Sequence, residues 1–442
     1  MKPSYYNTLV PERNGNGTVI FNARSSAIGL LDDAELALYR ELESLPEGET
    51  PGHEAAQLLE SLKANGFAMA TAEVEANYMR YQFEKYRYDD AVFELYIAPT
   101  MGCNFNCPYC FEKKREGRMS PETQDALLDF IHEQYDSRPF QKLKIIWYGG
   151  EPLLCIDIIE KLSERLIDFC EDNGVEYIAS MISNTSLADE HVQEKLLRCR
   201  VWSVMTTIDG VRETHEARRV NKGGAPTYEK ILKNVEGMTD KGICVDFRCI
   251  LEKGNVDSCL KLTESMARHE NLGIRVKPMR DMSELADRLG REVPEAAKVE
   301  PLEPAEYAEA FYKVFLQGTP KADDYKRALD PLHLHCSAAM DRGYAIDELG
   351  NAYNCGCAIG DEAKALFSIK EPPETRRVRW DMVSWYASHN PLDKHVCRTC
   401  QVLPLCQGGC LRIDEEPWSE CNPLKFIIDK MVADYYEAIE SE

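Results

Sequence analysis

The chain has 442 residues, with 52 Lys and Arg against 75 Asp and Glu, so its formal net charge at pH 7 is −23. This length allows two to three domains and a large core, and the charge argues against nucleic acid or an anionic membrane surface as a partner. Because the acidic residues are spread along the chain, they also suit a simple solubilising surface.

No segment has the features of a signal peptide, and none approaches the roughly 20 consecutive apolar residues that a membrane span requires. We therefore expect a cytoplasmic protein. In the reducing cytosol, the 17 cysteines would not form a disulfide framework, so metal binding is the favoured explanation.

Residues 1–90 are expected to form a small module. The sequence predicts a β-hairpin around 17–22 and an amphipathic helix, followed by a Pro-, Gly- and Glu-rich break at 46–52. A second helix would end at Gly66 in a left-handed cap, before a short strand at 67–70. The module carries 8 Lys and Arg against 15 Asp and Glu, which disfavours DNA binding.

This hairpin, helix pair and strand resemble the winged-helix-like peptide-recognition element of enzymes that modify ribosomally made peptides. The resemblance implies that the module captures a leader peptide, most simply by adding a strand to the edge of its sheet. The alternative is a module that only packs against the rest of the chain.

Over residues 91–320, apolar strand-like runs alternate with helical patterns in six β/α units. This alternation predicts an α/β fold, a partial (β/α)6 TIM-like barrel with helices outside and its chemistry at the C-terminal ends of the strands. The predicted strands are 93–99, 143–148, 177–182, 202–208, 243–248 and 274–278. The clearest predicted helices are 122–135, 158–171, 228–238 and 256–269.

Two segments fall outside this pattern. Residues 279–303 have mixed charge and several prolines, which predicts a surface loop, or alternatively a lining of the barrel mouth. Residues 426–439 form an amphipathic helical pattern that we expect to pack on the barrel.

Three cysteines follow the first predicted strand at the spacing C-x3-C-x2-C, namely Cys103, Cys107 and Cys110. Soft thiolates select zinc or iron–sulfur clusters, and a structural zinc site needs four ligands. The neighbouring sequence offers no fourth Cys or His. The loop is therefore either half of a split zinc site or the holder of a 4Fe–4S cluster with one iron open to a small molecule.

Polar motifs follow the next three predicted strands, where the strand ends of a barrel would bring them together. Two glycines permit a sharp turn and a close approach of the backbone to a ligand, and an adjacent glutamate adds an acceptor. In chain order the motifs are Gly149-Gly150-Glu151, Ser183-Asn184-Thr185, and the segment from Asp209 to Arg219.

The C-terminal part, residues 321–442, contains a second group of cysteines. Seven ordered thiolates exceed what one tetrahedral zinc can use, whereas two additional 4Fe–4S clusters need up to eight. The group consists of Cys336, Cys355, then Cys397, Cys400, Cys406 and Cys410 at the spacing C-x2-C-x5-C-x3-C, and Cys421.

The first three-cysteine loop, with Tyr109 before its third Cys, resembles the signature of the radical SAM superfamily. The resemblance implies that the open iron binds the amino and carboxylate groups of S-adenosylmethionine. It also implies that Gly149, Gly150 and Glu151 contact the amino group of the methionyl moiety.

The same resemblance implies that Ser183 and Asn184 lie near the adenosine ribose, although a helix N-cap explains these two residues equally well. The segment beginning at Asp209 is similar to the family's D-G…H…R segment. There Arg219 would pair with the carboxylate of S-adenosylmethionine, and the neighbouring Arg218 is the alternative.

The C-terminal cysteines resemble the SPASM domain position for position. The resemblance implies two auxiliary clusters and, with the first loop, three 4Fe–4S clusters in all. It assigns Cys336, Cys355 and Cys410 to the first auxiliary cluster and Cys397, Cys400, Cys406 and Cys421 to the second.

The first auxiliary cluster would lack a fourth ligand. Either Cys357 supplies it, or one iron stays open and could bind a substrate thiolate. His333 and His335 precede Cys336 and are further candidates.

The resemblance implies reductive cleavage of S-adenosylmethionine to a 5′-deoxyadenosyl radical, with an electron donor such as flavodoxin or ferredoxin as a partner. SPASM proteins act mainly on peptides and proteins, so we expect maturation of a precursor peptide with a leader segment, with thioether or other side-chain crosslinking as the product. The alternatives are an anaerobic sulfatase-maturating enzyme that forms formylglycine, and a non-catalytic iron–sulfur electron carrier or scaffold.

Overall fold

The structure is a computed structural model and describes residues 1–46, 48–266, 272–278, 300–317, 320–332, 337–410 and 421–442. His333, His335, Cys336 and most of the predicted loop 279–303 therefore lie outside the described residues. The chain forms two compact units, Met1–Arg87 with Glu303–Cys336 and His389–Glu442, and Tyr88–Leu302 with Ser337–Ser388. One boundary between the units lies at Arg87 and Tyr88, and the C-terminal third of the chain is divided between the units.

The larger unit is built on a parallel β-sheet. Its strands are β6 (Val92–Ile97), β7 (Lys142–Trp147), β8 (Glu176–Ile182), β9 (Val201–Thr207), β10 (Cys244–Leu251) and β11 (Leu272–Pro278). They lie in the order β11-β10-β9-β8-β7-β6, and every neighbouring pair is parallel. The six predicted β/α units are confirmed.

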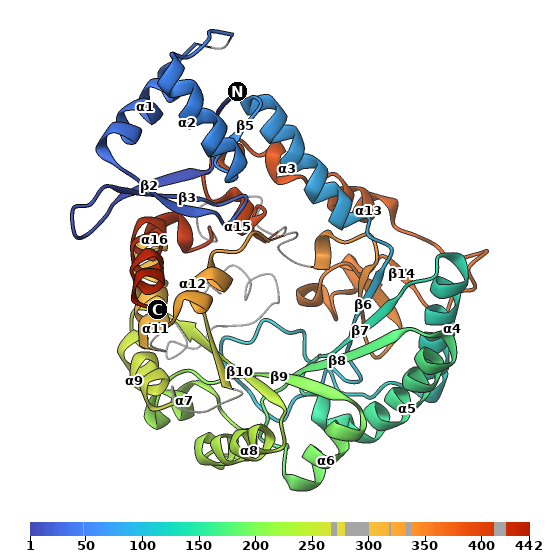
Figure 1. The fold of residues 1–442 in the computed structure, drawn as a ribbon. Coiled ribbons are helices and arrows are strands. Elements are labelled where there is room, and N and C mark those ends of the chain that lie inside the picture. Colours follow the sequence, from blue (N-terminus) through green and yellow to red (C-terminus); the bar gives the residue numbers. More distant parts are fainter. Residues whose placement is uncertain (47, 267–271, 279–299, 318–319, 333–336, 411–420) are drawn as a thin grey trace. The chain divides into compact units, whose positions relative to one another are not determined.

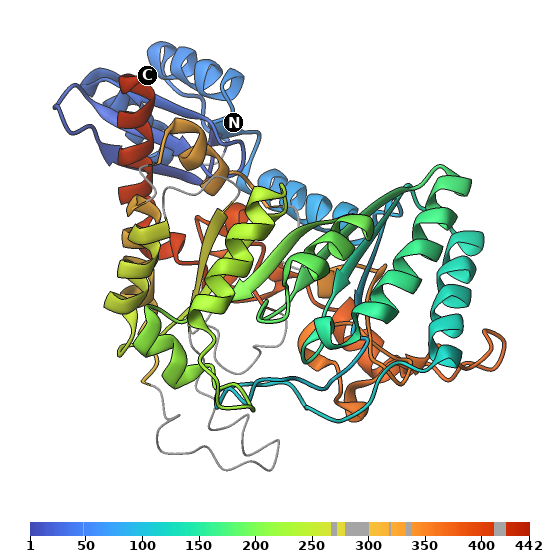
Figure 2. The ribbon, with the colours of Figure 1, turned by 90° about the horizontal axis from the view of Figure 1, so that it is seen from below.

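Helices cover the outer face of this sheet, as Figures 1 and 2 show. They are α4 (Pro121–Ser137), α5 (Ile156–Asn173), α6 (Glu190–Arg198), α7 (Arg212–Arg218), α8 (Tyr228–Asp240) and α9 (Val256–Met266). Alternate residues of the strands point to the helices and are fully buried, for example Phe93, Leu143 and Phe247. Burying these large apolar side chains is the main favourable term in folding this unit.

The sheet continues beyond β6 into the cysteine-rich part of the chain. β12 (Gly343–Ile346) pairs in parallel with β6, and β13 (Asn351–Tyr353) and β14 (Phe367–Ser368) follow in antiparallel. Helix α13 (Trp380–Ala387) ends this part of the larger unit. Residues 343–368 thus extend the barrel sheet rather than fold apart from it.

The smaller unit contains the antiparallel sheet β2-β3-β4 and the short pair β1-β5. The strands are β1 (Lys2–Pro3), β2 (Asn7–Pro11), β3 (Thr18–Asn22), β4 (Ile28–Leu31) and β5 (Ala68–Met69). The predicted hairpin and returning strand are therefore present.

Helices α1 (Asp33–Ser44), α2 (His53–Ala64) and α3 (Ala72–Arg87) follow the small sheet. Asp32 and Glu35 form a reciprocal capping box at the start of α1, and Gly66 adopts a φ of +85° just after α2, as its position predicts. The sequence reading missed α3, because its apolar positions are interrupted by charged and tyrosine residues.

The rest of the smaller unit comes from the C-terminal third of the chain. Its helices are α11 (Pro304–Gln317), α12 (Ala322–Ala328), α14 (His395–Arg398), α15 (Leu403–Cys406) and α16 (Leu424–Ser441). Helix α16 packs on β2, α11 and α12 with Ile427, Met431 and Val432 in the core. The amphipathic tail was predicted correctly as a helix, and within the smaller unit it packs on β2, α11 and α12.

No helix within the described residues is both long and apolar enough to cross a membrane.

Helix α7 buries a histidine whose protonation couples stability to pH. His215 is fully buried against Thr227 and Tyr228, and burial first, with the positive charge of Arg219 second, lowers its pKa to about 3. Between pH 6.5 and pH 3 the unfolded chain binds a proton that the folded chain does not, so stability is lost as pH falls below 6.5.

Because of this proton uptake by the unfolded chain, we expect the free energy of unfolding to fall by about 2 kcal/mol as the pH is lowered from 6.5 to 5. Urea unfolding of wild type and of His215→Phe across this range measures the effect, because the variant should show the shallower pH dependence whatever its baseline stability. His191→Gln, at an exposed position of α6, is the control. Equal slopes for wild type and His215→Phe would contradict the expectation.

Candidate functional site

The three-cysteine loop leaves the C-terminal end of β6. Its cysteines, Cys103, Cys107 and Cys110, are all partly buried. The loop is held by main-chain pairing with the segment after α7, since Asn106 N donates to Val220 O (2.7 Å) and Lys222 N donates to Asn104 O (2.9 Å). Three thiols are thus presented on one short, anchored loop.

Burial raises the pKa of the Cys103 thiol to about 11, and the negative charge of Glu151 adds to the effect. Burial also raises the pKa of Cys110. The backbone N–H of Phe105 donates to Cys103 Sγ at 3.4 Å. Thiols in such surroundings are protonated unless a cation stabilises the thiolate, which is what a metal centre does.

Gly149 and Gly150 end β7 beside this loop. Gly149 has a φ of +105°, and a Cβ there would lie 2.3 Å from the carbonyl oxygen of Thr100; a Cβ on Gly150 would lie 2.2 Å from that of Gly102. Gly150 N and Glu151 N donate to these same two carbonyls. The glycines are therefore needed for the close packing of two chain segments, and their contact with a ligand stays a prediction.

The Glu151 carboxylate is completely buried and joins two strand ends. Its Oε1 accepts hydrogen bonds from Leu153 N (3.0 Å) and Ser183 Oγ (2.7 Å), and its Oε2 accepts from Asn184 N (2.7 Å). Burial raises the pKa of Glu151, and the hydrogen bonds from Asn184, Ser183 and Leu153 oppose that rise. These contacts fix the turn after β8 against the turn after β7.

Asn184 carries the connection back to the cysteine loop. Its Nδ2 donates to Asn104 Oδ1 (2.7 Å) and lies 4.0 Å from Cys103 Sγ. The alternative role of 183–185 as a helix N-cap is wrong, because Asp189 caps α6. Asn104 was missed in the sequence reading, and nothing but its place between two motif cysteines could have suggested it.

A buried group of charged and aromatic residues lies beyond β9. Tyr109 OH donates to Asp209 Oδ2 and accepts from Arg219 Nη1 at 3.0 Å. Burial raises the pKa of Tyr109 well above its usual value. Burial alone would lower the pKa of Arg219, but the neighbouring Tyr109, Cys107 and Asp209 raise it by more than burial lowers it. The pKa therefore lies above its usual value, and the guanidinium is charged.

The two neighbouring arginines differ in their partners. Arg218 pairs with Glu252 and lies 3.4 Å from Asp209 Oδ2. Arg219 makes no ion pair with any described residue, and its Nε has no hydrogen-bond partner there. The same holds for Oδ1 of Asp209 and for Nε and Nη2 of Arg218.

These unpartnered atoms indicate which chemical groups a ligand of this site would need. A buried guanidinium without a carboxylate costs free energy unless an anion completes it, and the Asp209 oxygen needs a donor. A ligand with a carboxylate and an ammonium or hydroxyl group satisfies both. Next to the three thiols, the residues present fit an iron–sulfur cluster together with such an amino-acid-like ligand.

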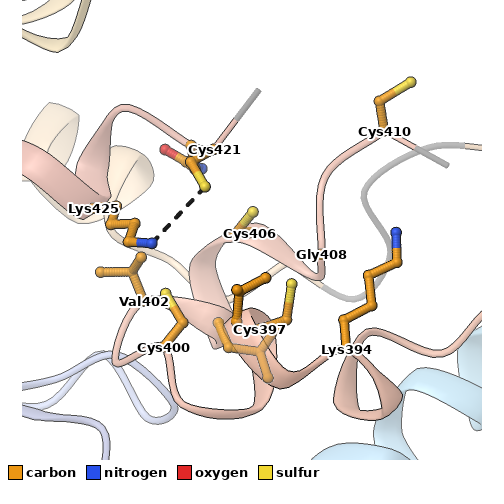
Figure 3. Close-up of a pocket in the computed structure, with 12 residues that line it drawn as sticks. Lys394, Cys397, Cys400, Val402, Cys406, Gly408, Cys410, Cys421 and Lys425 are labelled. Carbon is orange, nitrogen blue, oxygen red and sulfur yellow. Dashed lines mark hydrogen bonds between the residues drawn. The ribbon is translucent and has the colours of Figure 1, made fainter. Parts of the chain in front are cut away.

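A second cysteine site lies in the smaller unit, in the pocket shown in Figure 3. The pocket is lined by Cys397, Cys400, Cys406, Cys410 and Cys421, among other residues. Figure 3 shows Cys410 pointing away from the other four, which face the space between them. The four thiols come from both sides of the 14 residues between Cys406 and Cys421. The segments that bring them together are α14 and α15 with their flanking turns and the residues just before α16.

The thiols of this site influence one another. Burial raises the pKa of Cys397 to about 11, with a contribution from Cys406, and burial also raises the pKa values of Cys406 and Cys421. Lys425 Nζ approaches Cys421 Sγ at 4.0 Å, where it stabilises negative charge on sulfur. In the described part of the chain, no three His, Cys, Asp or Glu side chains converge on a single metal ion. The thiols of a 4Fe–4S cluster instead bind different irons around a cube.

Cys355 and Cys357 lie in the larger unit, close to the end of β7. Cys355 is partly buried and packs against the core cluster that contains Tyr148 and Met101, and Cys357 is exposed. Since Cys336 lies outside the described residues, the first auxiliary set of Cys336, Cys355 and Cys410, with or without Cys357, stays a prediction.

The structure also shows how the cysteine loop is fastened to this segment. Arg115 pairs with Asp347 (2.7 Å) and Glu348, and Lys113 pairs with Asp361 (2.9 Å). The sequence reading missed these pairs because no local pattern relates residues more than 200 positions apart.

Residues 97–264 match the family model of the Radical SAM superfamily. A cysteine-type anaerobic sulfatase-maturating enzyme of Clostridium perfringens is 23% identical over 345 residues, which cover 72% of this chain and 88% of that enzyme. Other curated relatives, 28 to 30% identical, are matched over only 35 to 48% of their own length.

Two solved structures share the fold. One, described as native anSMEcpe with bound AdoMet and Cp18Cys peptide, is 16% identical with a TM-score of 0.57, covering 78% of this chain and 99% of that chain. The other is the crystal structure of Streptococcus suis SuiB bound to precursor peptide SuiA, at 14% identity and a TM-score of 0.50. It covers 94% of this chain and 98% of that chain.

The hydrogen bonds of Glu151 predict that replacing it by glutamine, which has nearly the same shape, lowers the stability of the protein. In Glu151→Gln, an amide NH2 would face at least one of the three donors, leaving a buried donor unsatisfied, at a cost of about 1 to 3 kcal/mol. Urea unfolding followed by circular dichroism measures this. Glu176→Gln, whose carboxylate is 59% exposed and pairs with Lys142, should change stability by less than about 0.5 kcal/mol. Equal effects would contradict the structural role of Glu151.

The second cysteine site predicts a defined loss of iron. Cys397→Ala, prepared without air and reconstituted, should contain about four fewer iron atoms per chain than wild type, because one 4Fe–4S cluster loses a ligand. Metal analysis and the absorbance of the clusters measure this, with Cys244→Ala as the control. Unchanged iron, or zinc in its place, would contradict the assignment.

Proposed function

The chain carries a radical SAM domain, and we propose that it reductively cleaves S-adenosylmethionine and modifies a ribosomally made precursor peptide. The expected product is a thioether or another side-chain crosslink. The observation that carries the proposal is the joint placement, at one end of the parallel sheet, of three thiols, a buried carboxylate network and an Arg219 whose Nε has no hydrogen-bond partner among the described residues.

In this proposal Cys103, Cys107 and Cys110 would hold a 4Fe–4S cluster, and the chemistry that this cluster would supply when bound is the one-electron reductive cleavage of S-adenosylmethionine. Arg219 pairs with the carboxylate of S-adenosylmethionine through two parallel N–H donors. Arg218 is the weaker candidate, because Glu252 and Asp209 already neutralise it.

The remaining motif residues position these groups. Glu151 fixes the turns that carry Gly149, Gly150, Ser183 and Asn184, and these turns would border the methionyl and ribose parts of the cofactor. The Asp209 oxygen without a described partner accepts from a donor of the ligand. Burial of this network keeps water away from the reacting atoms.

We further propose three clusters. Four converging thiols in the pocket of Figure 3 support the second auxiliary cluster, held by Cys397, Cys400, Cys406 and Cys421. The first auxiliary cluster would use Cys336, Cys355 and Cys410, with Cys357 either closing it or leaving one iron open. A flavodoxin or ferredoxin would supply electrons.

The peptide substrate is supported by the small N-terminal sheet. Strand β4 lies at its edge, where a leader peptide could add one strand through main-chain hydrogen bonds. The shared fold with SuiB, whose structure contains its precursor peptide, points the same way.

The second candidate is oxidation of a Cys or Ser to formylglycine in a sulfatase. The match to a sulfatase-maturating enzyme over 88% of that enzyme's length favours it. Mass spectrometry separates the two candidates: a thioether crosslink removes two hydrogens and leaves no carbonyl, whereas formylglycine reacts with a hydrazide. Peptides encoded beside this gene are the substrates to test first.

The cluster loop predicts a complete loss of cofactor cleavage in Cys103→Ala and in Cys107→Ala. Each variant removes one of three cluster ligands, so anaerobically reconstituted protein with dithionite and S-adenosylmethionine should form no 5′-deoxyadenosine above background. Liquid chromatography measures the product, and Cys244→Ala should retain wild-type activity. Wild-type activity in either loop variant would refute the assignment, and an inactive wild type would leave only an electron carrier or scaffold.

A further inference from the structure

Residues 111–118, which we call the return segment, connect the third cysteine of the loop to α4. They form neither helix nor strand, so individual contacts set their position rather than a ladder of main-chain hydrogen bonds. At its far end the segment is tied to the chain that follows β6, because the hydroxyl of Thr100 donates to Gly117 O at 2.6 Å. The middle of the segment is held by a different part of the chain.

Arg115, in the middle of the return segment, binds two buried carboxylates. Its Nη2 lies 2.7 Å from Asp347 Oδ2 and 3.1 Å from Glu348 Oε2, and its Nε donates to Glu348 Oε1. The side chains of Asp347 and Glu348 are 0% and 2% exposed. A bidentate pair between a guanidinium and a carboxylate fixes direction as well as distance, and buried carboxylates are costly without a partner. Arg115 therefore has one well-defined place.

The position of Asp347 is set by the hairpin to which it belongs. It lies between β12 and β13, and its carboxylate also accepts from Leu349 N (3.0 Å), Asn351 N (2.8 Å) and Tyr353 OH (2.9 Å). Strand β12 pairs in register with β6, after which the cysteine loop begins. The contacts thus form a closed ring, because β12 lies beside β6 and the turn after β12 holds the return segment of the loop.

A second turn of the same part of the chain lies against the loop. Lys113 Nζ pairs with Asp361 Oδ1 at 2.9 Å. A Cβ on Gly360 would lie 3.2 Å from Met101 Cε and 3.4 Å from the carbonyl oxygen of Lys113. The turn that follows Cys355 therefore packs directly on both ends of the cysteine loop.

These carboxylates and this turn lie outside the part of the chain that matches the family model. The matched region ends at residue 264, whereas the contacts of Arg115 and Lys113 come from residues 347–361. The arrangement of the cysteine loop within the larger unit is therefore not a property of the matched region alone.

We propose that Arg115 is a positioning residue for S-adenosylmethionine. Its ion pairs with Asp347 and Glu348 hold the cysteine loop in the arrangement that binds the cofactor. This inference rests on the proposed function, because it names a further residue on which binding of the same cofactor depends. When a fraction of the molecules holds the competent arrangement, the apparent affinity falls to that fraction of its full value. Loss of the anchor therefore weakens binding without removing a cluster ligand.

The experiment compares reconstituted wild type, Arg115→Gln and Arg376→Gln under anaerobic conditions. Equilibrium dialysis with radiolabelled S-adenosylmethionine measures the affinity. Arg115→Gln should bind at least about tenfold more weakly than wild type at equal iron content. Arg376→Gln is the matched control and should bind as wild type does, because Arg376 forms the same kind of bidentate pair with Glu133 of α4, at 2.7 and 2.8 Å.

A second variant separates positioning from general stability. Arg115→Gln/Glu348→Gln removes a buried positive and a buried negative charge together, so urea unfolding should show a stability closer to wild type than that of Arg115→Gln. Its affinity for S-adenosylmethionine should stay reduced, because the bidentate anchor is still absent. Recovery of wild-type affinity together with stability would overturn the inference.

Hydrogen exchange of the reconstituted protein, before the cofactor is added, gives a readout that does not depend on the reaction. Amides of residues 101–118 should exchange faster in Arg115→Gln than in wild type or Arg376→Gln, because the loop opens more often. Unchanged exchange in Arg115→Gln, or an equal loss of affinity in Arg376→Gln, would overturn the inference. Equal binding by wild type and Arg115→Gln would refute the inference alone, whereas a wild type that binds no S-adenosylmethionine would refute the proposed function as well.

Discussion

The buried carboxylate of Glu151 is the constraint on which the candidate site depends. It accepts three hydrogen bonds from groups that follow two different strands, and Asn184 passes the connection on to the loop of Cys103. A fully buried carboxylate is tolerated only when its oxygens are satisfied. Moving the ends of β7 and β8 apart would break these hydrogen bonds and leave the buried carboxylate unsatisfied. That cost keeps the two strand ends and the cysteine loop in one arrangement.

The glycines beside Glu151 show how close that arrangement is. Neither Gly149 nor Gly150 could carry a Cβ without colliding with the carbonyls of Thr100 or Gly102. Two adjacent glycines are often explained by a bound ligand, but here the immediate reason is the approach of two protein segments. The segments that carry Gly149, Gly150 and the cysteine loop are therefore packed together before any ligand binds, so the site is preformed.

The two faces of the parallel sheet divide the work of the larger unit. The helical side contains large apolar side chains that stabilise the fold, whereas the opposite, open side also carries ion pairs such as Lys144 with Glu94 and Arg275 with Asp246. Side chains that break the rules of sheet stability, such as the facing Arg248 and Arg275, lie on the open side. Core residues and charged residues thus alternate along the same strands.

The sequence alone determined which candidate site residues follow which strand. It predicted six β/α units, with three thiols after the first strand and polar motifs after the next three. It could do so because hydrophobic periodicity and cysteine spacing are local properties. It also predicted α16 as a helix, because Ile427, Met431 and Val432 recur at helical spacing. The helix α3 escaped it because charged and tyrosine residues interrupt the apolar stripe.

Only the tertiary structure decided which surfaces these elements share. The place of α16 on the small sheet, the extension of the barrel sheet by β12, and the pairing of Arg115 with Asp347 all join residues far apart in the chain. The pairing of Arg218 with Glu252 is likewise a contact that no spacing rule predicts. Such contacts depend on packing and charge in three dimensions, and a one-dimensional pattern does not contain them.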